Sequence, residues 1–227
     1  MRFLPGFIAN VAPHVDGIIA LDDGSTDGTF EFLESRPEEV VRLLRVPPER
    51  PAWDEPGNYQ ALVTAAAEAG ADWVISLDAD ERVERRFRVR AERAIRRGRL
   101  LGCDAFAVRL RDLWGSPDRH RVDGVWGRKA PLRMFRARRP GAGFDARPVH
   151  ASKAPLDARR LGRYPPLADV CVYHLRMIDP ADRFLRRRRY EELDPGGRLN
   201  AGFSYEYLTD EAGLQLRPVD GKRGFVE

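Results

Sequence analysis

The chain is poor in two residue types that often dictate how a small protein is built. Its 227 residues include only two cysteines, Cys103 and Cys171, far apart and in no metal-binding motif. This excludes a disulfide framework and a cysteine-based zinc site, and both thiols are expected to be free and buried. Lysine is nearly as scarce, since the 39 basic residues include only Lys129, Lys153 and Lys222.

Long hydrophobic runs are also missing. No stretch approaches the roughly 20 apolar residues of a membrane-spanning helix. Residues 1–11 lack the apolar core and small-residue cleavage site of a secretion signal. We therefore expect a cytoplasmic protein, with peripheral contact to an anionic membrane as a further option. Apolar residues still make up 43% of the chain, enough for the core of one domain.

The charge balance is only mildly basic. The 39 basic residues are offset by 35 acidic ones, and no nucleic-acid-binding motif is present. We expect no nucleic-acid partner, whereas anionic small molecules or an anionic membrane surface remain compatible with the charge. The arginine-rich stretches 85–99 and 186–189 are interpreted as solvated helix faces, with phosphate contact as the alternative.

Helix and strand patterns alternate over the first third of the chain. The expected elements are a helix over 3–11, a strand over 17–21, a helix capped by Asp27 to Ser35, a strand over 40–46, a loop over 49–57, a helix over 58–69 and a strand over 72–77. This order predicts an α/β fold with a parallel sheet and right-handed crossovers.

The pattern changes after residue 84. The expected elements are a helix over 86–97, a strand over 104–113, strands over 131–136 and 167–175, and a helix over 179–193 with Asp179 as its cap. The chain beyond Asp194 is weakly patterned. We therefore divide the chain into a main domain, 1–178, and a C-terminal helix and irregular tail, 179–227.

Two short acidic clusters each follow a predicted strand. They are Asp22-Asp23-Gly24-Ser25-Thr26-Asp27-Gly28-Thr29 and Asp78-Ala79-Asp80-Glu81. The carboxyl ends of parallel strands meet at one edge of a sheet, where ligands bind in α/β proteins. Neighbouring carboxylates repel each other, so a site that retains them is expected to hold a cation.

The second cluster has the donor set of a hard divalent cation. Asp78 and Asp80 offer two carboxylates from one turn, and Mn²⁺ or Mg²⁺ prefers such oxygen ligands while keeping positions for phosphate oxygens. A diphosphate can fill those positions. His174, at the end of a predicted strand, is either a third metal ligand or a core histidine. A solvated acidic turn is the alternative for the cluster itself.

The first cluster is suited to a nucleoside. Asp22 and Asp23 can accept from a base N–H or a ribose hydroxyl, and Gly24 with Ser25 allows close backbone approach. A plain turn followed by a helix cap is the alternative for the small residues.

A calcium loop competes for the same residues. The segment from Asp23 to Glu34 has acidic or hydroxyl residues at the first, third and fifth positions, glycine at the sixth and glutamate at the twelfth. Residues 29–35 separate the two interpretations, because they are helical in the strand–helix reading and loop in the calcium reading.

The order of these motifs resembles family 2 glycosyltransferases. The similarity rests on the first cluster, the helix over 58–69 and the Asp78 turn 55 residues after Asp23. It continues more weakly through Arg133-Met134-Phe135-Arg136, Pro148-Val149-His150 and Tyr173-His174-Leu175-Arg176. The resemblance implies a GT-A fold, with a Rossmann-like, mostly parallel sheet flanked by helices and a mixed C-terminal extension on the acceptor side.

The resemblance also implies an activity. A sugar would pass, with inversion, from a nucleotide-diphospho-sugar to a hydroxyl of a glycan, a lipid-linked or a small-molecule acceptor, as in bacterial cell-envelope synthesis, and a homodimer is an option. The donor half would be residues 1–84 and the acceptor half 85–178. By the resemblance, Asp22 or Asp23 would contact base or ribose, Asp78 ribose or metal, and Asp80 metal and diphosphate.

The sequence departs from this family at two points. It has no apolar strand ahead of the helix over 3–11, which leaves a truncated or inactive GT-A-like binding protein as an alternative function. Ala151 stands where the family has a glutamate after Val-His. His150 is therefore the candidate general base, with Asp145 as a competitor. Three aromatic residues are candidates for stacking on an acceptor sugar or for the core: Trp114, Trp126 and Tyr164.

Overall fold

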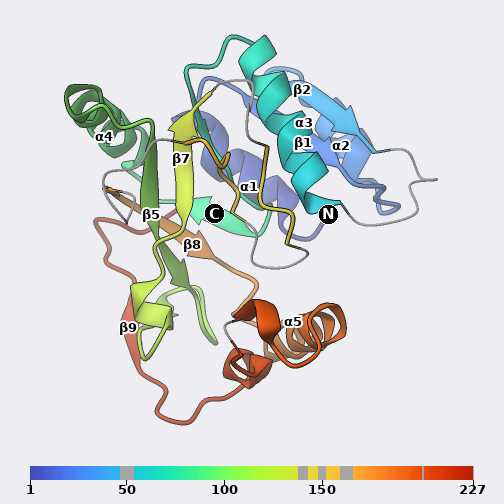
Figure 1. Cartoon of the computed structure of the whole chain (residues 1–227), viewed down its shortest axis with the longest axis vertical. Helices are drawn as coiled ribbons and strands as arrows, with labels where there is room; N and C mark the ends of the chain where they lie inside the picture. The colour runs from blue at the N-terminus through green and yellow to red at the C-terminus, as the bar shows by residue number, and fades with distance from the viewer. Residues whose placement is uncertain (47–53, 138–142, 148–151, 159–165, 201, 227) are drawn as a thin grey trace.

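The computed structural model of the chain describes residues 1–46, 54–137, 143–147, 152–158, 166–200 and 202–226. Three regions follow one another along its longest axis (Figure 1). A helix-and-strand region from the N-terminal third leads to a five-stranded sheet, and a region around a long C-terminal helix lies at the opposite end.

The N-terminal region is built from two parallel strands and the helices beside them. Its elements are α1 (Leu4–Val11), β1 (Ile18–Asp22), α2 (Thr29–Glu34) and β2 (Val40–Arg45). β1 and β2 pair in parallel, as the alternation predicts. The predicted Asp27 cap is one residue early: Gly28 is the cap, and its φ of 82° is left-handed backbone that suits glycine. Asp27 instead accepts from the hydroxyl and N–H of Thr29.

The next helix, α3 (Glu55–Glu68), begins before the predicted start at residue 58. The Asp54 side chain caps it by accepting from the Gly57 N–H, and Pro56 suits the first turn because its missing N–H is not needed there. Pro56, within the predicted loop over 49–57, is therefore part of the helix start.

The third strand differs from its prediction. β3 (Trp73–Ile75) does not pair with β1 in the described structure; it pairs antiparallel with β7 (Leu132–Arg136) at the edge of the second sheet. That sheet has the order β3-β7-β5-β8-β4 and is completed by β5 (Ala105–Asp112), β8 (Leu167–His174) and β4 (Glu81–Val83). β5 and β8 are parallel, and the other pairs are antiparallel.

The core lies between this sheet and the helices. α4 (Phe87–Leu101) packs on β8, and α1 packs on β4. The buried side chains that join these elements are Leu4, Ile8, Val83, Phe87, Phe106, Val108, Val170 and Val172.

The C-terminal region is more ordered than its weak sequence pattern indicates. α5 (Pro180–Leu193) starts as predicted, with Asp179 accepting from the Ala181 N–H. Two strands of three residues, β6 (Arg119–Arg121) and β9 (Leu216–Pro218), pair antiparallel, and they are too short to show a period in the sequence.

The structure shows the state of the two cysteines and the character of the helices. Cys103 and Cys171 are both free and buried, as predicted. Among the described residues, no helix combines the length and the apolar character needed to cross a bilayer.

The end of the chain returns to the five-stranded sheet through one buried carboxylate. Glu84 is fully buried; its Oε1 accepts from the Cys171 N–H and Arg223 Nη2 at 2.8 Å each, and its Oε2 accepts from Arg223 Nε at 2.9 Å. Arg223 Nη1 also donates to Asp169 at 2.8 Å, and its carbonyl accepts from the Tyr173 hydroxyl. The tail beyond α5 is thus held against β8.

Replacing Arg223 by alanine should lower the free energy of unfolding by about 3 kcal/mol, because the buried Glu84 would lose both hydrogen bonds from Arg223 and keep only the more distant Arg90, at 3.5 Å, as a cation. Urea denaturation followed by circular dichroism measures the loss. Lys222→Ala, on the exposed neighbouring residue, is the matched control and should change stability by less than about 0.5 kcal/mol. Equal effects of the two substitutions would show that the Glu84 contact contributes nothing to the attachment of the tail.

Candidate functional site

The second acidic cluster forms a tight turn between β3 and β4, and Glu81 holds that turn together. Glu81 is 1% exposed; its Oε2 accepts from the Asp78 N–H at 3.0 Å, and its Oε1 is 2.8 Å from Arg133 Nη2. Arg133, on β7, also donates to the Ser76 carbonyl at 3.2 Å. The turn is therefore clamped to the sheet, and Glu81 serves its geometry rather than a ligand.

Asp80, in the same cluster, is buried as well. Its Oδ2 lies 3.4 Å from His174 Nε2, and its carbonyl accepts from the Leu175 N–H. Its Oδ1 is buried and has no hydrogen-bond partner among the described residues. A carboxylate oxygen in that state is costly unless a cation or donor joins it, so Oδ1 is the atom of the cluster that could accept one.

His174 links Asp80 to a second buried acid. Its Nδ1 is 2.8 Å from Asp112 Oδ1, and Asp112 Oδ2 is 2.9 Å from Lys129 Nζ. Burial lowers the pKa of His174, but the carboxylates of Asp80 and Asp112 outweigh it and raise that pKa to about 9. Arg186, from α5, approaches His174 Nε2 at 3.2 Å. Asp112 belongs to β5 and Arg186 to α5, whereas Asp80 lies in the acidic turn and Lys129 in the loop before β7.

Asp78 faces a different cation. Its carboxylate forms an ion pair with Lys153, which is itself largely buried. Although burial opposes ionisation, Lys153 and Arg133 hold the pKa of Asp78 well below its ordinary value. The structure thus brings Asp80 and His174 into contact and gives Asp78 an ammonium partner. In the described part of the chain, no group of three or more metal-type side chains is assembled.

The first cluster forms the turn after β1. Asp22 is 1% exposed, and both its carboxylate oxygens accept from the Ser25 N–H at 3.3 Å. Asp23 is half-buried, while Gly24, with a φ of 78°, and Ser25 are exposed. Asp22 therefore fixes the turn, and Asp23 with the Gly24–Ser25 backbone forms the surface that a ligand would meet.

The helix that follows decides against the calcium loop. Residues 29–34 form α2, as the strand–helix interpretation requires, so Glu34 lies at the end of a helix rather than at the end of a binding loop. The segment entering the turn is a strand, whereas a calcium loop of this type is entered by a helix.

Other candidate residues have different outcomes. Trp114 and Trp126 are each 2% exposed in a buried cluster with Tyr205, so of the two alternatives the core interpretation holds for both. Asp145 is paired with Arg147, which lowers its pKa. His150 and Tyr164 lie outside the described residues and stay predictions.

Five residues that shape this site are not among those predicted from the sequence: Asp112, Lys129, Arg133, Lys153 and Arg186. One signal was available. Lysine is so scarce that the positions which keep it stand out, and two of its three positions pair with buried or half-buried acids here. Arg186 was grouped with a solvated helix face, but it turns toward His174.

Comparison with known proteins agrees with this arrangement of motifs. The sequence model described as glycosyl transferase family 2 matches residues 4–147, well over half of the chain. The chain belongs to this family. It therefore has the GT-A fold, here with its central sheet curled and flanked by helices. The match includes both acidic clusters, the α3 helix and Arg133.

Two curated relatives are uncharacterised proteins, one from Mycobacterium bovis and one from Mycobacterium tuberculosis. Each is 30% identical over 225 residues, which cover 94% of this chain and 54% of the relative. The chain thus spans about half the length of the curated relatives it matches.

The ion pairs of His174 should make stability fall at alkaline pH. Since its folded pKa of about 9 exceeds the ordinary 6.5, their contribution is complete below pH 6.5 and is lost as pH rises through 9. The upper limit is about 3 kcal/mol. Urea unfolding of the wild type and of His174→Gln, with EDTA present, should show the difference between them shrinking from pH 6 to pH 10.

His120→Gln is the matched control, because burial and then Arg111 lower the pKa of His120 and so move its titration away from the alkaline range. A wild-type advantage over His174→Gln that stays constant from pH 6 to pH 10 would show that His174 is not held protonated.

Proposed function

We propose that the protein transfers a sugar from a nucleotide-diphospho-sugar to an acceptor hydroxyl, with Mn²⁺ or Mg²⁺ at the second acidic cluster. Family membership supports the class of reaction. The observation that carries the metal assignment is the buried Oδ1 of Asp80, which has no hydrogen-bond partner among the described residues and lies two positions after a second acid, Asp78. A divalent cation there would balance charge on a departing diphosphate.

The donor set fits such an ion. Mg²⁺ is commonly held by one or two carboxylates, with substrate phosphates and water completing the shell, so three protein ligands are not required. Asp80 and Asp78 supply the oxygens. His174 can join them as a nitrogen ligand for Mn²⁺ only after losing its proton, because both imidazole nitrogens carry hydrogen in the charged form.

Cationic side chains around the turn suit a diphosphate. Lys153 contacts Asp78, and the half-buried Arg186 lies beside His174. Fixed cations at a place where negative charge develops favour the transition state, because they need little reorganisation in a site with little water. The first cluster, through Asp23 and the Gly24–Ser25 backbone, is proposed to hold the base or ribose.

The acceptor half carries the proton chemistry. A direct attack by the acceptor hydroxyl, with inversion, needs a base to take its proton. His150 is the proposed base. The competing Asp145 is less suited, since Arg147 lowers its pKa and so makes it a weaker base.

The proposal also covers the acceptor and the place of the reaction, each as a broad class. A cell-envelope glycan, a lipid-linked sugar or a small molecule would each present a hydroxyl. Cytoplasmic action with peripheral contact to an anionic membrane fits the exposed arginines of α4 and α5, such as Arg96 and Arg188. A homodimer remains part of the proposal.

Asp80→Asn should abolish metal-dependent nucleotide binding while leaving the fold intact, because the amide keeps the shape of the side chain and loses its charge. Isothermal titration with UDP, GDP and dTDP in the presence of Mn²⁺ measures the affinity. Asp118→Asn, on an exposed loop residue, is the matched control and should bind as the wild type does. An unchanged affinity in Asp80→Asn would refute the metal assignment. Nucleotide binding without sugar transfer to any acceptor would favour the inactive binding protein.

Lys153→Met should raise the affinity for Mn²⁺ alone by about tenfold, which corresponds to 1.4 kcal/mol. The reason is competition, since the Lys153 ammonium pairs with the Asp78 carboxylate that the metal would use. The same substitution should weaken binding of the metal–nucleotide pair, because a phosphate partner is lost. Mn²⁺ titration followed by electron paramagnetic resonance separates the two effects, and Lys222→Met is the control. A weaker affinity for Mn²⁺ alone would contradict the competition.

A further inference from the structure

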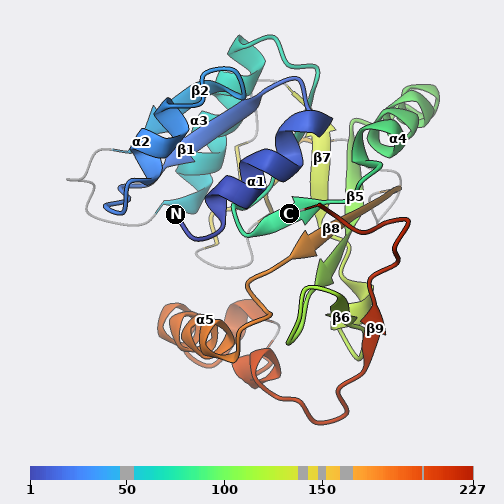
Figure 2. The ribbon, with the colours of Figure 1, turned by 180° about the vertical axis from the view of Figure 1, so that it is seen from behind.

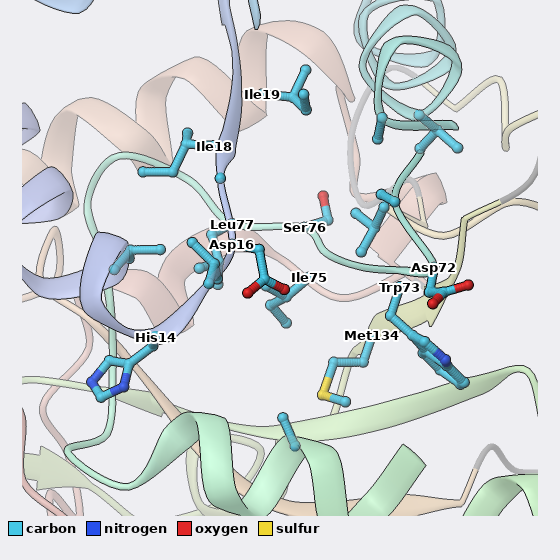
Figure 3. A pocket seen from close by; sticks show the side chains of 18 of the residues that line it. His14, Asp16, Ile18, Ile19, Asp72, Trp73, Ile75, Ser76, Leu77 and Met134 are labelled. Atoms are coloured by element: carbon cyan, nitrogen blue, oxygen red, sulfur yellow. The ribbon is translucent and has the colours of Figure 1, made fainter. Parts of the chain in front are cut away.

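Helix α4 has two unlike faces. Its inward residues Phe87, Ala91 and Ile95 border an apolar cavity of about 660 Å³ beside β3 (Figure 3). Because inward positions recur every three or four residues, they form one stripe along the helix. Two opposite views show α4 at the margin of the molecule (Figure 1, Figure 2). The outer face of the helix consists of residues that are all exposed: Val89, Arg93, Arg96, Arg97 and Leu100.

The outer face is strongly basic. α4 contains six arginines and one glutamate, so the helix has a net charge of +5, whereas the whole chain has +4. No described residue forms an ion pair with Arg93 or Arg97. Arg96 lies 3.8 Å from Glu92, whose carboxylate also pairs with Arg88. Most of the positive charge on this face is thus uncompensated within the described part of the chain.

Exposed apolar side chains accompany these cations. Val89 is 47% exposed, Leu100 is 88% exposed, and Leu101, the last residue of the helix, is 56% exposed. Positions 89, 93, 96 and 100 are separated by four, three and four residues, which places them along one line of a helix. Two arginines therefore lie between two apolar residues on one solvent-facing ridge, and a pair of leucines ends that ridge.

The other arginine-rich helix differs in how its charges are balanced. On α5 the arginines at 187–189 each form an ion pair with a glutamate of the same helix. Its exposed apolar residues, Phe184 and Leu185, therefore lie beside cations that already have acidic partners. The combination of exposed apolar side chains with uncompensated arginines is found on α4 and not on α5.

The chemistry of the outer face favours one class of partner. Arginines attract anionic lipid headgroups, while leucines at the same level can enter the boundary between headgroups and acyl chains. A second copy of the chain is disfavoured, because a two-fold contact would bring two basic faces together. A nucleic acid fits less well, since the one aromatic residue of α4, Phe87, is buried and no base can stack on it.

We propose that the outer face of α4 docks the protein on a bilayer that contains anionic phospholipids. The helix lies along the membrane surface, with Arg93, Arg96 and Arg97 at the headgroup phosphates and with Val89 and Leu100 toward the acyl chains. This inference rests on the peripheral membrane contact proposed above and assigns that contact to one surface. It does not depend on sugar transfer, because the outer face contains no residue of the two acidic clusters.

Vesicle flotation measures the docking directly. The purified chain, without nucleotide or metal, is mixed with vesicles of phosphatidylcholine alone or with vesicles in which about a third of the lipid is phosphatidylglycerol. We expect at least about tenfold stronger partition to the anionic vesicles, and loss of this preference when NaCl is raised from about 0.05 M to about 0.5 M. Equal partition to the two kinds of vesicle, or binding to neither, would overturn the proposal.

Paired arginine variants locate the contact. Arg93→Gln combined with Arg97→Gln should lower partition to anionic vesicles at least about tenfold, because each cation near an anionic surface contributes roughly fivefold. Arg188→Gln combined with Arg189→Gln, on α5, is the matched control and should bind as the wild type does. If the α5 pair loses binding and the α4 pair keeps it, the membrane contact stands but its assignment to α4 is refuted.

Leucine variants test the apolar part of the contact. Leu100→Ser combined with Leu101→Ser should weaken partition about tenfold, since binding at a membrane interface scales with the apolar area that is buried. Phe184→Ser combined with Leu185→Ser is the control of equal exposure on α5 and should have no effect. Circular dichroism should show an unchanged fold in both, because all four side chains are exposed.

Two further outcomes would contradict the proposal. Unchanged partition of the α4 leucine variant would show that no apolar side chain of this helix enters the bilayer. Binding of the wild type to single-stranded RNA, without binding to anionic vesicles, would identify the basic face as a nucleic-acid surface instead.

Discussion

The buried charge chain from Asp80 through His174 and Asp112 to Lys129 is the interaction on which the site depends. Its members come from the acidic turn, the end of β8, the end of β5 and the loop before β7. Each charge has an opposite charge within reach, which is the condition under which ionised groups are tolerated in a protein interior. Removing Asp112 would take away the carboxylate that His174 and Lys129 share.

The same buried charge network also helps to hold the turn of residues 78–81 in place. Glu81, paired with Arg133, fixes the backbone of the turn. His174 fixes the side chain of Asp80. Arg186 extends the network to α5, so the C-terminal helix takes part in positioning the acidic turn. A carboxylate held in this way needs no rearrangement to accept a cation, and preorganisation of this kind is a main source of electrostatic stabilisation in active sites.

The order of elements and the two acidic turns could be predicted from the sequence. Periodicity and the position at which a strand ends are determined by residues that are adjacent in the sequence. The partner of β3 could not, since a three-residue strand carries too little pattern to specify its neighbour. The charge partners of Asp78 and Asp80 were also beyond reach: Lys153 and His174 lie 75 and 94 residues further along the chain than Asp78 and Asp80. Burial of Trp114 and Trp126 depended on Tyr205, from a segment without visible pattern.

The separation of β1 from β3 has a mechanical consequence. In the described structure the first acidic turn belongs to the two-stranded sheet and the second to the five-stranded sheet, and no backbone ladder joins the two. Side-chain packing, and not a hydrogen-bonded register, therefore sets the spacing between the two turns. A nucleotide that touches both turns would link the two sheets directly and fix their relative position.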